Sequence, residues 1–117
     1  MESKKFEAEV LTGETIRSSR WSAFISHLGA LSMLEVSGDV VIGNPGIEVD
    51  LLKRPPSASV SPALLQLDLF LYQRPGLWPQ LAYDKALSYW SSDTNFTVVE
   101  IYYNNKVVEH LVVSTTK

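Results

Sequence analysis

The chain contains no cysteine, only two histidines and no zinc-enzyme motif. Without cysteine it can form no disulfide, no thiolate nucleophile and no sulfur-ligated zinc site. His27 and His110 are far apart in the sequence, and neither His-x-x-x-His nor HExxH spacing occurs. We therefore predict no metal site and no other cofactor.

Clustered positive charge is also missing. Ten basic residues against thirteen acidic residues give a net charge of −3, whereas binding to a phosphate backbone needs grouped Lys and Arg. No G-x-S-x-G, Walker A or Rossmann glycine pattern is present. Gly43-Asn44-Pro45-Gly46 lacks the lysine of a phosphate loop and is predicted to be a turn. Nucleic acid is excluded as an expected partner.

Long apolar runs are absent as well. None approaches the ~18 residues of a membrane-spanning helix, and the opening MESKKFEAEV has no signal-peptide core. We expect no membrane span and a cytoplasmic location.

The composition that remains is typical of a globular protein. Of the 117 residues, 45% are hydrophobic and 20% charged, which is far from the composition of disordered chains. This length suits one domain with one core, so residues 1–117 are predicted to form a single domain.

Alternating apolar residues predict several strands. In Leu64 to Tyr72, the odd-numbered leucines lie on one face, opposite Gln66, Asp68, Phe70 and Tyr72. Further strands are expected at 6–10, 33–36, 39–42, 47–53 and in the closing segment 96–114, with 39–42 either separate or the bent half of one strand. The proline-rich residues 53–62 are predicted to be a loop.

Two segments have helical spacing. Trp21, Phe24, Ile25, Leu28 and Leu31 recur at i, i+3, i+4, i+7 and i+10, which predicts an amphipathic helix from Thr15 to about Leu31. A second helix is predicted from Pro79 to Ser91, because proline suits a first helical turn and apolar residues again recur at helical spacing. The expected order is β-α-β-β-β-α-β-β. This order predicts an α+β fold, with two helices packed on one face of a mostly antiparallel twisted sheet of about five to six strands.

The register of the last hairpin has two solutions. A two-residue turn at Asn104-Asn105 suits the positive φ angles of a type I′ turn but sets Glu100 opposite Glu109, which is unfavourable. A three-residue loop from Asn104 to Lys106 sets Glu100 opposite His110 instead. The sequence leaves both open.

Both faces of this hairpin are apolar, and two helices can cover only one of them. Exposed apolar surface often marks an interface, so the second face, or the hairpin's edge, is predicted to contact another chain; the alternative is cover by the proline-rich loop and the chain's own long side chains. The predicted interface residues are Phe96, Val98, Tyr102, Val108 and Val112, with Trp78 as an exposed aromatic anchor.

These features favour a non-enzymatic protein-binding module, a homodimeric adaptor or chaperone-like protein. The element order is loosely analogous to that of small acidic dimeric secretion chaperones. One alternative is a small-molecule-binding domain or enzyme with a pocket between sheet and helices, using Asp68 and His110 as acid and base. Another is a structural subunit of a phage or viral assembly.

Overall fold

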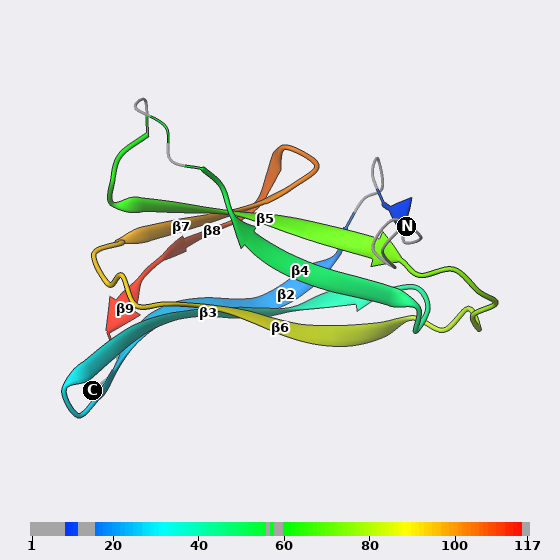
Figure 1. Cartoon of the computed structure of the whole chain (residues 1–117), viewed down its shortest axis with the longest axis horizontal. Helices are drawn as coiled ribbons and strands as arrows, with labels where there is room; N and C mark the ends of the chain where they lie inside the picture. Colours follow the sequence, from blue (N-terminus) through cyan, green and yellow to red (C-terminus); the bar gives the residue numbers. More distant parts are fainter. Residues whose placement is uncertain (1–8, 12–15, 56, 58–59, 116–117) are drawn as a thin grey trace, which may run out of the picture.

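The protein is an all-β sandwich in the computed structural model, which describes residues 9–11, 16–55, 57 and 60–115. Nine strands follow one another along the chain, and no helix occurs among these residues (Figure 1). The strands are β1 (Glu9–Val10), β2 (Ser18–Leu28), β3 (Leu31–Ile42), β4 (Ile47–Lys53), β5 (Leu64–Gln73), β6 (Tyr83–Ser91), β7 (Val98–Tyr103), β8 (Lys106–Val112) and β9 (Ser114–Thr115).

The first sheet has five strands and β5 at its centre. One side of β5 pairs with β4; the other side pairs with β7 over its first half and with the short β1 near its end. Strand β8 pairs with β7 and forms the outer edge. The β5–β7 pairing is parallel and the other three are antiparallel.

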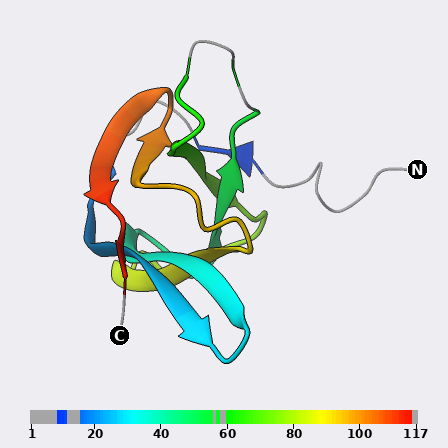
Figure 2. The ribbon, with the colours of Figure 1, turned by 90° about the vertical axis from the view of Figure 1, so that its left-hand side faces the viewer.

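The second sheet has four strands in the order β6-β3-β2-β9. Antiparallel pairs join β6 to β3 and β3 to β2, whereas β9 lies parallel to β2. Figure 2 shows the two sheets facing each other, with the chain passing from β8 in one sheet to β9 in the other.

The core fills the space between the sheets. From the second sheet it takes the even-numbered residues of β3, and from the first sheet the odd-numbered residues of β5 and β7. The fully buried side chains are Leu34, Val36, Val40, Ile42, Leu65, Leu67, Leu69, Val99 and Ile101. The alternation predicted for residues 64–72 is therefore confirmed, and residues 33–42 belong to one long strand.

The α+β prediction is wrong, because both predicted helices are strands. Strand β2 includes Trp21, Phe24 and Ile25, and β6 occupies most of the segment from Pro79 to Ser91. Each has the 12-residue β3 beside it, whose ladder pairs the backbone groups that face it and overrides local helical spacing. Gly29, with φ of 63°, forms the turn between β2 and β3 instead of fraying a helix.

The first predicted strand is seen only in part. Residues 6–8 lie outside the described residues, while Glu9–Val10 form β1. The turn at residues 43–46 is present: the side chain of Asn44 accepts a hydrogen bond from the Gly46 backbone N–H at 2.8 Å and exchanges two more with Gln73.

Candidate functional site

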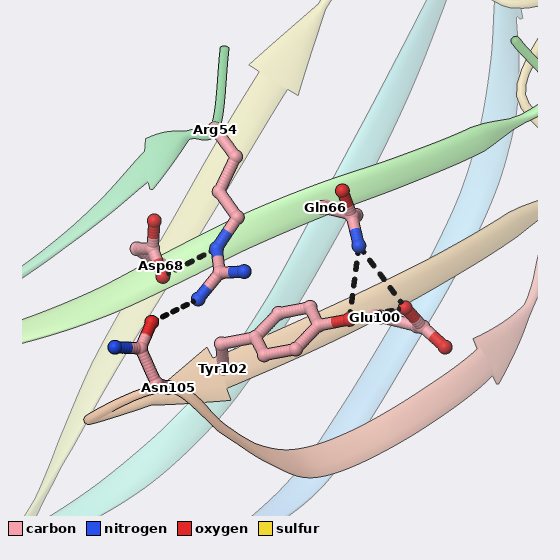
Figure 3. Close-up of polar contacts among 6 residues, drawn as sticks. All are labelled: Arg54, Gln66, Asp68, Glu100, Tyr102 and Asn105. Carbon is pink, nitrogen blue, oxygen red and sulfur yellow. Dashed lines mark hydrogen bonds and ion pairs between the residues drawn. The ribbon is translucent and has the colours of Figure 1, made fainter. Parts of the chain in front are cut away.

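A polar cluster covers part of the outer face of the first sheet (Figure 3). Parallel pairing sets Gln66 beside Glu100 and Asp68 beside Tyr102. All four point outward because their neighbours on β5 and β7 point into the core. Arg54, directly after β4, and Asn105, in the β7–β8 turn, complete the cluster.

Arg54 holds one half of the cluster together. Its Nε donates to Asp68 Oδ1 at 2.9 Å, and a terminal nitrogen donates to Asn105 Oδ1 at 2.8 Å. The guanidinium carbon lies 3.9 Å from the centre of the Tyr102 ring, which is within the range of a cation–π contact. Arg54 thus covers the ring of Tyr102, which lies on the hairpin face for which the sequence predicted no covering helix.

Tyr102 organises the other half. Its hydroxyl donates to Glu100 Oε1 at 2.6 Å and accepts from Gln66 Nε2 at 2.9 Å. The hydrogen bond to Glu100 raises the pKa of Tyr102 above the ordinary 10.0, and burial raises it further. The phenol is therefore held neutral, as a hydrogen-bond donor.

These contacts leave little reactive chemistry in the cluster. Asp68, a candidate acid, is ion-paired with Arg54. His110, the candidate base, lies exposed on β8 across from Glu100, but the carboxylate of Glu100 accepts from Tyr102 and Gln66. The structure thus brings Asp68 and His110 to one face of the sheet, and neither lines the pocket described below.

The predicted pocket between sheet and helices does not exist, because the helices are strands. A pocket of about 260 Å³ lies elsewhere, between the end of β4 and the start of β5. Its walls include Lys53, Arg54 and Phe96. Lys53 Nζ lies 5.5 Å from the Phe96 ring centre, and Arg54 is engaged as described above.

The residues predicted as an interface are spread over different environments. Phe96 is buried and Val108 packs against the core. Val98 and Tyr102 are half-buried on the outer face, and Val112 is 74% exposed. The outer surface therefore offers only part of the predicted set.

Trp78, predicted as an exposed anchor, is half-buried in the loop before β6. Its indole N–H donates to the Arg74 carbonyl at 2.9 Å, and the Arg74 guanidinium lies 5.7 Å from the ring centre. The ring packs so closely on Gly46 that a Cβ there would come within 2.3 Å of it. Trp78 fixes this loop to the β3–β4 turn.

Several exposed apolar side chains lie on, or shortly before, a strand that was predicted to be a helix. Leu77 is fully exposed, and Leu81, Tyr83 and Trp90 are 60%, 38% and 50% exposed. We call β6, together with Leu77 and Leu81 in the segment before it, the β6 edge, because β6 is the last strand of its sheet. The alternation of Tyr83, Leu87 and Tyr89 with Asp84, Ala86 and Ser88 was the signal that could have revealed it.

Metal binding has no support in the described part of the chain, where no three His, Asp or Glu side chains are grouped as ligands. Nor does any helix that could span a membrane occur among the described residues. No family model matches the chain, and neither a curated protein nor a solved structure shows significant similarity to it. The chain is thus placed by its architecture, as an all-β sandwich.

Proposed function

We propose that this protein is a non-enzymatic protein-binding module that acts in the cytoplasm and uses the β6 edge as its contact surface. The supporting observation is that exposed apolar side chains lie on the edge strand β6 and in the segment directly before it. Of nine exposed large hydrophobic residues among those described, Leu77, Leu81, Tyr83 and Trp90 lie at this edge. Such surface is typical of interaction sites, and an open edge offers backbone hydrogen bonds to a partner strand.

The state of the polar groups also supports binding over catalysis. The carboxylates of Asp68 and Glu100 each have a hydrogen-bond donor from the chain itself. A general acid or base needs free access to its substrate, and Asp68 is ion-paired with Arg54. The analogy with secretion chaperones no longer supports the proposal, because it depended on the two predicted helices. A structural subunit of a larger assembly would use the same contact surface.

The test is affinity purification of the tagged full-length protein from its native host, with mass spectrometry of the retained proteins. Trp90→Ser with Leu81→Ser alters the β6 edge, and both positions are exposed, so folding should be preserved. The matched control is Val107→Ser with Val112→Ser, on exposed positions of β8. We expect the wild type and the control to retain the same partner and the edge variant to lose it.

Two results would contradict the proposal. Loss of the partner in the β8 control alone would assign the interface to the outer face of the first sheet. Retention of no protein beyond that held by an unrelated tagged domain would remove the support for a binding function.

A further inference from the structure

The second side of β6 has no strand partner in the described part of the chain. On its first side, β6 pairs with β3 at nine consecutive positions without a register shift. Its second side therefore presents a regular row of backbone N–H and C=O groups, the kind of template to which another strand adds.

Proteins usually protect such an edge with proline, a bulge, a short strand or charges. β6 contains no proline, is nine residues long and is regular. Its only charges, Asp84 and Lys85, lie at its beginning, whereas Tyr89 and Trp90 lie at its end. Neither charged residue has an ion-pair partner among the residues that the structure describes.

We propose that β6 pairs antiparallel with β6 of a second copy of this chain, about a two-fold axis at Leu87. This inference rests on the proposed function, because it assigns a partner to the same β6 edge. The two four-stranded sheets then join into one continuous sheet of eight strands. Leu87 is the midpoint of Tyr83–Ser91, so this register pairs all nine residues, whereas a shift to either side leaves residues at the ends unpaired.

The distribution of charge favours a second copy in this register. Antiparallel pairing about Leu87 sets Lys85 opposite Tyr89 of the second copy and Asp84 opposite its Trp90. Lys85 and Tyr89 lie on the same face of the sheet, as do Asp84 and Trp90, because each pair is an even number of residues apart. An ammonium group beside an aromatic ring is attractive, the indole N–H can donate to the carboxylate, and no like charges are opposed.

Charge variants at Ala86 and Ser88 test both the pairing and its register. Both positions are exposed, and in the proposed dimer each lies opposite the other. In the double variant Ala86→Lys with Ser88→Lys, both of these cross-strand pairs consist of two lysines. In the double variant Ala86→Lys with Ser88→Glu, both pairs consist of a lysine and a glutamate. At low salt, we expect analytical ultracentrifugation to show dimerisation of the wild type, about tenfold weaker dimerisation of the first variant and near wild-type dimerisation of the second.

Cysteine cross-linking gives a second readout, since the natural chain has no cysteine. A mixture of Ala86→Cys and Ser88→Cys chains places the two thiols directly opposite, at a Cα separation that permits a disulfide. We expect the mixture to cross-link faster than either variant alone.

The outcomes separate self-pairing from the proposed function. A wild type that stays monomeric into the high micromolar range, or two charge variants that dimerise equally, would overturn the self-pairing. If the edge variant nevertheless loses a captured protein, the binding function stands with a different partner. If the wild type dimerises in this register but retains no other protein, self-pairing stands and the adaptor role is withdrawn.

Discussion

At the scale of single residues, the outer face of the first sheet shows how a chain can satisfy its own polar groups. Arg54 bonds to Asp68 and Asn105 and covers Tyr102. The side chains of Arg54 and Asp68 are about one quarter exposed, so their ion pair contributes modestly to stability. Its larger effect is that the donors of Arg54 and the carboxylate of Asp68 are already engaged with each other and not free to bind a ligand.

Tyr102 gives a pH-dependent prediction at this scale. Its hydrogen bond to Glu100 raises the pKa of the phenol in the folded state above 10.0. Its stabilising contribution is therefore complete below pH 10 and is lost as pH rises through the folded-state pKa. We expect the free energy of unfolding of the wild type to fall more steeply above pH 10 than that of Tyr102→Phe, measured by urea unfolding at a series of pH values.

Glu100→Gln provides the control for the cause of this effect. It removes the carboxylate that accepts from Tyr102, so phenolate absorbance should show Tyr102 titrating at lower pH than in the wild type. Burial also raises the pKa of Tyr72 and Tyr89, and their contributions should persist in both variants. Equal alkaline slopes for the wild type and Tyr102→Phe would be incompatible with this account.

At the scale of elements, strand β2 departs from regular alternation at one point. The register shifts between Ser19, which pairs with Asp39, and Ser22, which pairs with Ser37. Arg20 and Trp21 therefore both stand opposite Gly38, and Arg20 has a φ of 56°, as in a β-bulge. The indole ring of Trp21 occupies the space that a side chain at residue 38 would need.

This contact predicts that Gly38→Ala is destabilising. The added Cβ would lie 2.4 Å from two carbons of the Trp21 ring, so the ring must move, at a cost of about 1–3 kcal/mol. Gly43→Ala is the matched control, because nothing lies within 4 Å of a Cβ there, and it should change stability by less than about 0.5 kcal/mol. Urea unfolding followed by circular dichroism measures both, and equal stability of the two variants would show that Trp21 yields freely.

The β7–β8 hairpin combines the two registers that the sequence left open. Asn104 and Asn105 form the two-residue turn, with φ of 55° and 65°, and Tyr103 pairs with Lys106. The register then shifts, so that Ile101 pairs with Glu109 and Glu100 with His110. A bulge at Val108 thus keeps the favourable turn and avoids two opposed glutamates.

At the scale of the whole molecule, the two sheets share one core. Leu34 from the second sheet and Leu67 from the first are both fully buried in the same cluster. The apolar face of a sheet must be buried against another element, and here each sheet covers the other. The two sheets are therefore expected to unfold together.

Leu34→Ala and Leu67→Ala test this cooperativity. Each removes a fully buried side chain and should lower the free energy of unfolding by about 2–5 kcal/mol. In each variant, tryptophan fluorescence and far-ultraviolet circular dichroism should report one coincident transition in urea. Separate transitions for the two probes in either variant would show that the sheets are independent.

The sequence by itself determined the features that depend on neighbouring residues: the strand predicted at 64–72, the hairpin predicted within 96–114, the turn at 43–46, and the alternating faces of β5. Period-2 alternation and turn chemistry are local signals, so they can be read without the fold. The tertiary structure decided the states of β2 and β6. The bulge at Arg20 and Trp21 gives β2 helical spacing, and in Tyr83–Ser91 a partial alternation competes with helical spacing. The long ladder of β3, distant in sequence from β6, supplied their hydrogen bonds, and such non-local pairing outweighs local propensity.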